Sequence, residues 1–353
     1  MHMINKYQFY IAYHDKFNTA GSKAVLDCKS ILAEMGYEDF SIEDVSLGNK
    51  ITTWVTILRR VASFFLKLKP NAIVAIQYPL LSGNKYFGLF IKAAKTKNVK
   101  FFCIVHDLDD LRYKDSLTRK TYDVQILNGY DYVIVHNENM RRWLLENELK
   151  TPIIVLSIFD YLSIISPTNK PQLASVGNRI IFAGNLSKSH FIYALDVIKG
   201  FVFNLYGPNY RPEKGFSVKN ICWHGSLSAE ELLTNMSGEF GLVWDGEYID
   251  KLDENYGSYL KYNSPHKLSL YLAAGIPVIA PASSAVADFI KEHNIGILIN
   301  DLLELNNLEL EDDAYRIMQQ NVFAIKEKIS AGEYLSAAVN TIEETLYPLE
   351  LSA

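Results

Sequence analysis

Short apolar runs alternate with helical segments along the whole sequence, and this alternation constrains the fold more than any other feature. The run Phe101–Val105 is apolar at consecutive positions, not at every second one. A strand needs that pattern when both of its faces are buried, as in a parallel sheet covered by helices. Similar runs occur at Tyr7–Tyr13 and Ala72–Gln77, and others follow a polar segment with two prolines at 166–171. The sequence therefore predicts an α/β protein built from two doubly wound, Rossmann-like domains.

The chain length sets the expected domain boundaries. At about 100–200 residues per domain, 353 residues correspond to two domains of similar size. We expect one Rossmann-like domain over residues 1–165 and a second over residues 166–330. Residues 331–353 are predicted to form a terminal helix that packs back toward the N-terminal domain.

Composition excludes several classes of function. A net charge of −5 argues against a nucleic-acid binder, which is usually basic. Cys28, Cys103 and Cys222 are far apart and form no C-x-x-C pair, so neither a disulfide framework nor a zinc site is expected. The first residues lack the pattern of a signal peptide, and no apolar run is long enough to span a bilayer. These features predict a cytoplasmic protein.

The stretch Trp54–Leu68 has the pattern of an amphipathic helix with Arg59, Arg60 and Lys67 among its apolar residues. Such a helix can lie on an anionic membrane surface, which would make the protein peripheral at the inner face of the membrane. The same pattern is typical of a crossover helix that packs one face on a sheet and keeps its basic residues in solvent. The sequence favours the second interpretation.

The loops that follow strands are the places to look for function, because ligands of open parallel sheets bind beyond the carboxyl ends of the strands. The first such loop contains Thr19 and Gly21 before a helix, where backbone N–H groups could approach an anion. Thr19 could equally be a simple N-cap. The loop matches neither a dinucleotide fingerprint nor a P-loop.

A second loop contains His106 and Asp107 directly after a predicted buried strand. A histidine whose tautomer is set by a carboxylate can act as a general base. The D-x-D pattern formed with Asp109 could suggest a divalent metal, but acidic residues are also typical of the first turn of a helix. We expect no metal site here.

The second half supplies further strand-end residues. Gly184 and Asn185 form a predicted turn, and Lys188 follows at the expected start of a helix, where it could meet a phosphate. The next two loops contribute small or flat side chains near the backbone: Tyr206, Gly207 and Ser226. These could line a ligand or simply form turns.

The most informative segment is 258–280, which reads as loop, proline, helix, glycine and buried strand. Lys267 lies in the first turn of the predicted helix, close to Ser264. Exposed N–H donors, the helix dipole and an ammonium group together suit a diphosphate.

With these motifs in place, the chain resembles the GT-B nucleotide-sugar glycosyltransferases. Within them it is similar to bacterial β-1,6-galactofuranosyltransferases of O-antigen synthesis, and more distantly to the glucosyltransferase that extends N-acetylglucosamine on serine-rich adhesins. The stretches that carry the resemblance are Ile104–Arg112, Ile158–Leu162, Ile181–Ser187, Phe240–Gly246 and Tyr259–Leu272.

The resemblance implies a GT-B fold with the acceptor on the N-terminal domain and a UDP-sugar on the C-terminal domain. It implies no cofactor beyond the donor substrate, and an acceptor that is a glycan, a lipid-linked sugar or a glycoprotein. Thr19, Lys188 and Lys267 would lie near the diphosphate. A homo-oligomer is compatible with this assignment.

Two departures from the family pattern affect the expected mechanism. The Glu-x7-Glu pair of many retaining members is replaced by Asn263, Ser264 and Asp288, which favours an inverting reaction. The tyrosine or arginine that contacts the donor ring in relatives corresponds to Ser226 or one of its neighbours.

The resemblance thus implies a metal-independent hexosyltransferase with galactofuranose as the first candidate sugar and glucose as the second. A non-catalytic nucleotide-sugar-binding subunit is the alternative. Tyrosine is abundant, with 22 residues, and suits a cleft that binds sugars. The expected sugar-facing residues are Trp244, Asp245, Tyr259 and Tyr262.

Overall fold

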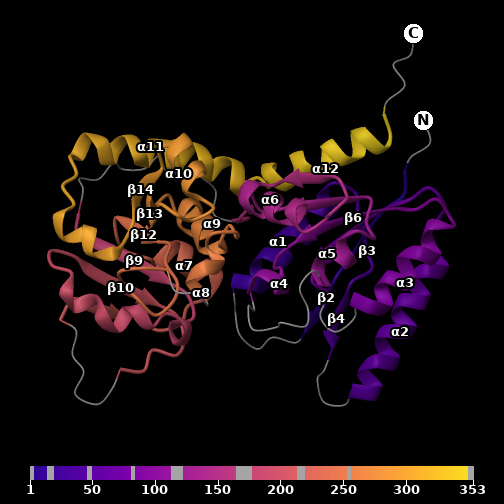
Figure 1. Ribbon diagram of the computed structural model, residues 1–353, viewed down its shortest axis with the longest axis horizontal. Helices are drawn as coiled ribbons and strands as arrows, with labels where there is room; N and C mark the ends of the chain where they lie inside the picture. The colour runs from indigo at the N-terminus through magenta and orange to yellow at the C-terminus, as the bar shows by residue number, and fades with distance from the viewer. Residues whose placement is uncertain are drawn as a thin grey trace, which may run out of the picture. The chain divides into compact units, whose positions relative to one another are not determined.

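The structure is a computed structural model that describes residues 4–13, 20–45, 50–80, 84–112, 122–163, 177–212, 219–252 and 256–348. The chain divides into two compact units. The first comprises Met1–Phe17, Ala24–Leu156 and Leu335–Ala353, and the second comprises Asn18–Lys23 and Ser157–Tyr334. Each unit contains one six-stranded sheet (Figure 1).

The first unit is built on a parallel sheet with the strand order β3-β1-β5-β6-β7-β8. Its strands are β1 (Lys6–Phe9), β3 (Glu38–Asp39), β5 (Ile73–Tyr78), β6 (Lys100–Val105), β7 (Tyr132–Val135) and β8 (Ile153–Val155). The predicted strand Tyr7–Tyr13 is divided in two. Its second part, β2 (Ile11–Tyr13), pairs in parallel with β4 (Ile42–Val45) in a separate two-stranded sheet.

The helices of the first unit connect these strands in order. They are α1 (Ala20–Glu34), α2 (Lys50–Lys67), α3 (Asn84–Lys95), α4 (Asp109–Arg112), α5 (Tyr122–Leu127) and α6 (Glu138–Glu146). A cluster of phenylalanine rings joins α2 and α3 to β1. Phe64 stacks at 5.6 Å from Phe9 and at 5.5 Å from Phe90, measured between ring centroids.

The C-terminal helix α12 (Glu333–Leu346) buries Leu335, Ala338, Val339 and Ile342 and also contacts the first unit through a carboxylate. Glu343 accepts hydrogen bonds from Lys6 Nζ at 2.6 Å and from the Tyr37 hydroxyl at 2.7 Å. Most of α12 belongs to the first unit, so the last helix of the chain packs next to β1 and the residue before β3, both near the N-terminus.

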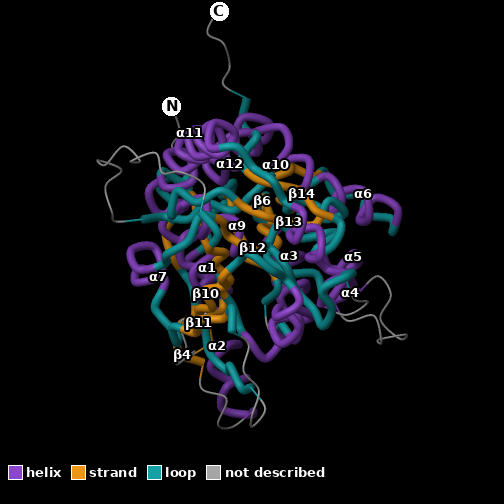
Figure 2. The backbone as a smooth tube through the Cα atoms, turned by 90° about the vertical axis from the view of Figure 1, so that its left-hand side faces the viewer, coloured by secondary structure: helices purple, strands orange, loops and turns teal. Residues whose placement is uncertain are grey.

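The second unit contains a parallel sheet with the order β11-β10-β9-β12-β13-β14. Its strands are β9 (Arg179–Ala183), β10 (Val202–Tyr206), β11 (Ile221–Trp223), β12 (Phe240–Leu242), β13 (Val278–Pro281) and β14 (Gly296–Ile299). Figure 2 shows these strands in the interior with helices around them.

The second unit carries both α-helices and 3-10 helices. Its α-helices are α7 (Ala229–Asn235), α8 (Tyr256–Tyr259), α9 (His266–Ala273), α10 (Ala287–His293) and α11 (Asp312–Ser330). The predicted helix after β9 is instead two 3-10 segments, η1 (Leu186–Lys188) and η2 (His190–Val197), and a third, η3 (Leu302–Asn307), follows β14.

Successive residues of β9 point into two different cores. Ile180 and Phe182 pack in one apolar cluster, whereas Ile181 and Ala183 pack in another. Both faces of the strand are therefore buried, which is why its sequence is apolar at consecutive positions. The predicted pair of parallel α/β sheets is confirmed. Among the described residues, none of the helices has the length and apolar character needed to cross a membrane.

Candidate active site

Each sheet has a point at which the strand order reverses, and ligands of open α/β sheets bind at the carboxyl side of such a point. In the second sheet β9 lies between β10 and β12, and in the first sheet β1 lies between β3 and β5. The predicted site residues follow strands near these positions. We describe the two half-sites separately.

In the second unit, the switch point is bridged by a tyrosine that the sequence did not single out. The Tyr271 hydroxyl accepts a hydrogen bond from the Ala183 N–H at 2.8 Å and donates one to the Leu242 carbonyl at 3.3 Å. It therefore joins β9 to β12 where the two strands begin to diverge. Position 241 lies against this ring and has room only for glycine, because a Cβ atom there would lie 2.2 Å from Cγ of the Tyr271 ring.

Lys267 forms the charged centre of this half-site. It lies in the first turn of α9, and its ammonium donates to Asp245 Oδ1 and to the Trp244 carbonyl, both at 2.8 Å. The ammonium also lies 4.6 Å from the centroid of the Phe182 ring. The Lys267 side chain is only 12% exposed, against 28% for Asp245. A mostly buried cation at a helix N-terminus, still open to solvent, can bind an anion.

Two glycines bring the backbones of adjacent strand ends unusually close together. Gly207 has a φ of +142°, and a Cβ atom there would lie 1.8 Å from the Gly184 carbonyl oxygen. The Gly184 N–H donates to the Tyr206 carbonyl, and the Gly207 N–H donates to the Gly225 carbonyl. Only glycine fits at position 207, so the loops after β9, β10 and β11 are fixed next to one another.

The polar residues predicted around these glycines line the same edge of the sheet. Asn185 caps η1 by accepting a hydrogen bond from the Ser187 N–H. Lys188 and Ser226 are exposed, after β9 and β11 respectively.

Gly21 lies in the first turn of α1, in the part of that helix that groups with the second unit. Thr19 lies outside the described residues.

Two predicted site residues have their rings in the core. The Tyr206 side chain is 2% exposed, and its hydroxyl accepts a hydrogen bond from the Ser237 N–H. The Trp244 side chain is fully buried, and its indole donates to the Tyr248 carbonyl. The rings therefore stabilise the fold, and it is the Trp244 carbonyl that reaches the half-site.

The residues before α9 fix the start of this helix. Ser264 donates from its hydroxyl to the Ser157 carbonyl at 2.9 Å. Tyr259 is buried and Tyr262 is half-buried, just before this turn. The first residue of α9, His266, packs against the Tyr161 ring at 5.0 Å between centroids. Burial and the nearby Lys23 ammonium lower the pKa of His266 to about 3, so the imidazole is neutral.

In the first unit, His106 follows β6 and is held by Gln77, at the end of the neighbouring strand β5. His106 Nε2 lies 2.8 Å from Gln77 Oε1. The other amide atom, Gln77 Nε2, donates to the Val25 carbonyl at 3.1 Å, which fixes the orientation of the amide. Gln77 Oε1 must then accept a proton from His106 Nε2, so in the neutral ring Nδ1 carries the lone pair that a base requires.

Asp107 is paired with a cation of the following helix, α4. Its Oδ2 accepts a hydrogen bond from Arg112 at 2.9 Å. From the sequence we expect a carboxylate to set the tautomer of His106, and this stays a prediction; the structure adds the Gln77 amide as a partner of Nε2. A buried glutamine at a strand end was a signal in the sequence that the prediction overlooked.

A buried carboxylate, Asp123, lies next to this loop. It accepts a short hydrogen bond from the Tyr78 hydroxyl and another from the Asp110 N–H at 2.9 Å. The pKa of Asp123 is raised to about 6, mainly because the carboxyl group is buried. Asp110 in turn accepts from the Asp123 N–H at 2.8 Å, so α4 and α5 are locked together. Among the described residues, no three acidic, histidine or cysteine side chains gather in a manner that could hold a metal ion.

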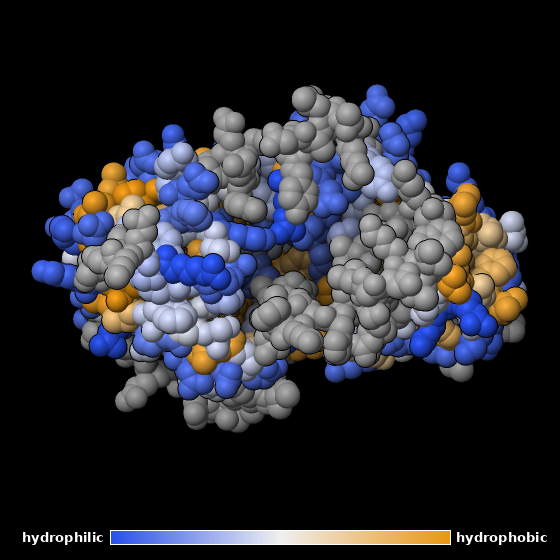
Figure 3. All heavy atoms as spheres, turned by 90° about the horizontal axis from the view of Figure 1, so that it is seen from below, coloured by the Kyte–Doolittle hydropathy of each residue, from blue (hydrophilic) through white to orange (hydrophobic). Residues whose placement is uncertain are grey.

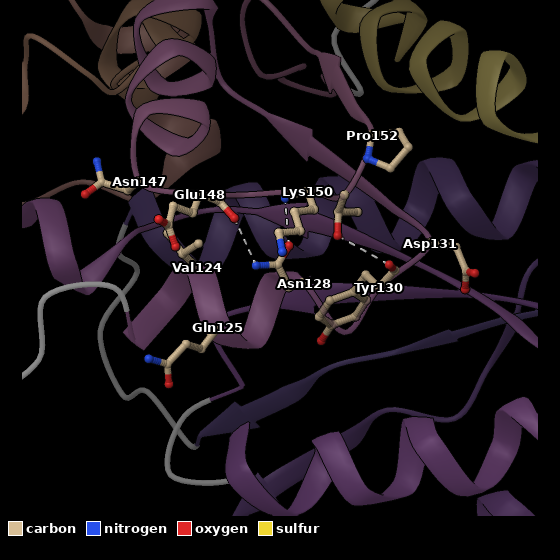
Figure 4. Close-up of a pocket in the computed structure, with 10 residues that line it drawn as sticks. Val124, Gln125, Asn128, Tyr130, Asp131, Asn147, Glu148, Lys150 and Pro152 are labelled. Carbon is tan, nitrogen blue, oxygen red and sulfur yellow. Dashed lines mark hydrogen bonds between the residues drawn. The ribbon is translucent and has the colours of Figure 1, made fainter.

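An open pocket of about 580 Å³ lies elsewhere in the first unit (Figure 4). It is lined by residues that precede β7 and β8, among them Asn128, Tyr130 and Thr151. Asn128 accepts from the Lys150 N–H and donates to the Glu148 carbonyl, so its amide is already used to hold the loops. The pocket lies at the amino ends of the strands, opposite the edge that carries His106.

Comparisons with known proteins identify the family of the chain. Residues 6–158 match the family of glucosyltransferase 3-like N-terminal domains, and residues 180–342 match the corresponding C-terminal domains. Beta-1,6-galactofuranosyltransferase WbbI of Escherichia coli strain K12 is 28% identical over 335 residues, which cover 93% of this chain and 95% of the relative. Glucosyltransferase 3 of Streptococcus gordonii is 28% identical over 323 residues, which cover 89% and 92%.

Solved structures show the same fold at low sequence identity. HepE from Anabaena, in complex with UDP and glucose, is similar with a TM-score of 0.57 at 12% identity, over 97% of this chain and 100% of that one. WaaG, a glycosyltransferase of lipopolysaccharide biosynthesis, has a TM-score of 0.54 at 10% identity, over 97% and 99%. Since the two family matches together span most of the sequence, the chain belongs to the glucosyltransferase 3-like family of GT-B, UDP-sugar-dependent hexosyltransferases.

Proposed function

We propose that the protein transfers galactofuranose from UDP-galactofuranose to a hydroxyl group of a glycan, lipid-linked or glycoprotein acceptor, with inversion and without a metal ion. The observation that carries the proposal is the mostly buried Lys267 ammonium in the first turn of α9, at the switch point of the second sheet. Of the sites formed by the described residues, this one is best suited to a diphosphate.

The donor is held by the second unit in this proposal. Lys267 and the first N–H groups of α9 bind the diphosphate, and Lys188 approaches it from η1. As the bond between the anomeric carbon and the diphosphate oxygen breaks, negative charge grows on that oxygen. Fixed donors that face growing charge lower the barrier strongly, which is the role that a metal ion has in other transferases. Asp245 and the half-buried Tyr262 contact the sugar.

The acceptor is activated by His106. Its Nδ1 takes the proton from the acceptor hydroxyl while the hydroxyl oxygen forms the new bond to the anomeric carbon. Gln77 holds the ring in the tautomer in which Nδ1 can accept that proton. Asp107, paired with Arg112, contributes negative charge close to the ring that becomes cationic.

The similarity to WbbI over nearly the whole chain supports galactofuranose as the transferred sugar. The similarity to glucosyltransferase 3, over almost as much of the chain, supports UDP-glucose as the second candidate donor. A donor panel separates the two candidates. The protein is incubated with each UDP-sugar and a panel of glycoside acceptors, with and without EDTA, and the products are identified by mass spectrometry.

We expect the addition of one hexose from UDP-galactofuranose, at the same rate in EDTA. Transfer from UDP-glucose alone would replace the first candidate with the second. Complete loss of transfer in EDTA would overturn the metal-free mechanism. Binding of UDP without transfer from any donor to any acceptor of the panel would indicate the non-catalytic subunit instead.

A further inference from the structure

The helix α2 exposes an apolar stripe to solvent. Val55 is 48% exposed, Leu58 is 41% exposed and Leu66 is 80% exposed. Residues 55, 58, 62 and 66 are spaced by three or four positions, and such residues lie on one side of a helix. Phe64 and Leu68, on the other side, are buried in the core. The helix is therefore apolar on both sides, although only one side is needed for packing.

Basic residues border this stripe. Arg59, Arg60 and Lys67 are exposed on α2. The neighbouring helix α3 adds Leu89, which is 66% exposed, and Lys92. We call this surface the α2–α3 patch, and its members are Val55, Leu58, Leu66 and Leu89 with Arg59, Arg60, Lys67 and Lys92. Figure 3 shows apolar and hydrophilic side chains exposed together on the side where Figure 1 places α2 and α3.

The charge of the α2–α3 patch is one-sided. The sequences of α2 and α3 contain no aspartate or glutamate, although the whole chain has a net charge of −5. An apolar stripe with positive charge beside it is complementary to a surface that is apolar below and anionic on top. The interface of a bilayer that contains anionic lipids has this structure.

The same charges make a second copy of the chain a poor occupant. In a two-fold symmetric dimer the same patch of both subunits meets, so arginine and lysine would face arginine and lysine. Like charges that are brought together at an interface oppose association.

We propose that the α2–α3 patch docks the first unit on the surface of a membrane that contains anionic phospholipid, with the apolar stripe inserted among the lipid headgroups and the basic residues on the phosphates. The proposal does not depend on which sugar is transferred.

Flotation with lipid vesicles tests the proposal. The full-length protein is mixed with vesicles of phosphatidylcholine alone, or with vesicles in which phosphatidylglycerol replaces part of the phosphatidylcholine. We expect binding to the second kind only, weakened by salt. Two variants address the two components: Leu58→Ser with Leu66→Ser removes apolar area, and Arg59→Glu with Arg60→Glu reverses charge. Each is expected to weaken binding about tenfold or more.

The helix α6 offers a matched control. It also carries two adjacent exposed arginines, Arg141 and Arg142, and an exposed leucine, Leu145, which is 48% exposed. However, α6 contains Glu138 and Glu146 as well. We expect Arg141→Glu with Arg142→Glu, and separately Leu145→Ser, to leave vesicle binding unchanged. All these side chains are exposed, so the variants should fold, which circular dichroism checks.

Three results would overturn the proposal. The first is a wild-type protein that does not float with anionic vesicles. The second is equal loss of binding in the α6 variants, because the attraction would then be a property of the total charge. The third is a dimer that dissociates in the Leu58→Ser, Leu66→Ser variant without any binding to vesicles, which would assign the patch to a second copy of the chain.

Discussion

Lys267 Nζ and Asp245 Oδ1 lie 2.8 Å apart, in an ion pair that is largely shielded from solvent. Lys267 belongs to α9, and Asp245 follows β12, so the pair joins the helix to the strand end at the switch point. A donor diphosphate at this place would meet an ammonium that already has an anionic partner. The affinity of the protein for the diphosphate should therefore depend on both Lys267 and Asp245.

The first prediction concerns the cation. Lys267→Met should weaken UDP binding by about tenfold to a hundredfold, because a charge-assisted hydrogen bond to phosphate is lost. Isothermal titration calorimetry measures the affinity. Lys261→Met, which changes an exposed lysine on the loop before α9, serves as the control and should leave it unchanged. Equal affinity in wild type and Lys267→Met would remove Lys267 from the diphosphate site.

The second prediction concerns Asp245, the ion-pair partner of Lys267. Asp245→Asn leaves the mostly buried Lys267 without a counter-ion, so the free protein should lose on the order of 1–3 kcal/mol of stability. UDP should restore that stability, because its diphosphate can take the place of the carboxylate. Thermal unfolding with and without UDP is the measurement. The UDP-induced rise in Tm should be larger in Asp245→Asn than in wild type, and a smaller rise would contradict the idea that the two anions compete.

The third prediction concerns packing at the switch point. Gly241→Ala would place a Cβ atom 2.2 Å from the Tyr271 ring, so the ring and its bridge between β9 and β12 must shift. We expect a loss of about 3 kcal/mol or more in the free energy of unfolding. Gly88→Ala is the matched control, because a Cβ atom there meets nothing within 4 Å and the residue lies in α3. Urea unfolding should show that change to be neutral or stabilising.

The fourth prediction concerns acid stability. His266 has a folded-state pKa of about 3, well below the value of about 6.5 in the unfolded chain. As the pH falls from 6 to 4, His266 therefore binds a proton in the unfolded state but not in the folded state. Stability should decrease by about 1.4 kcal/mol per pH unit from this group alone. His136, whose pKa is lowered to about 4 by burial, acts in the same direction.

Urea unfolding at a series of pH values measures this effect. His266→Gln should make the decrease between pH 6 and pH 4 shallower. His190→Gln changes an exposed histidine and should leave the slope as in wild type. A slope that is the same in all three proteins would show that His266 becomes protonated without unfolding.

The fifth prediction concerns the acceptor side. Gln77→Leu removes the oxygen that fixes the tautomer of His106, so kcat should fall about tenfold or more while KM for the donor stays the same. The pH profile of kcat should also change, which a purely structural role of Gln77 would not cause. Gln125→Leu, an exposed position at the pocket of Figure 4, is the control. A rise in the donor KM with unchanged kcat would contradict the assignment.

The sequence by itself determined the two parallel sheets and the segments that are candidates for the functional site. Consecutive apolar residues, such as those of β6 and β9, can only be buried by helices on both faces of a strand. Because ligands bind beyond the carboxyl ends of such strands, the residues after them, including His106 and Lys267, could be named as candidates without a structure. These are local properties, fixed by the order of residues along the chain.

Only the tertiary structure decided which of these side chains meet. Asp245 and Lys267 are 22 residues apart, and Gln77 and His106 are 29 apart, so no local pattern indicates that either pair is in contact. The same holds for Tyr271, whose hydroxyl reaches Ala183 across 88 residues. The register of parallel strands sets these distances. Burial likewise assigned the rings of Tyr206 and Trp244 to the core, because an aromatic residue near a strand end has the same sequence pattern whether its ring packs inward or faces a ligand.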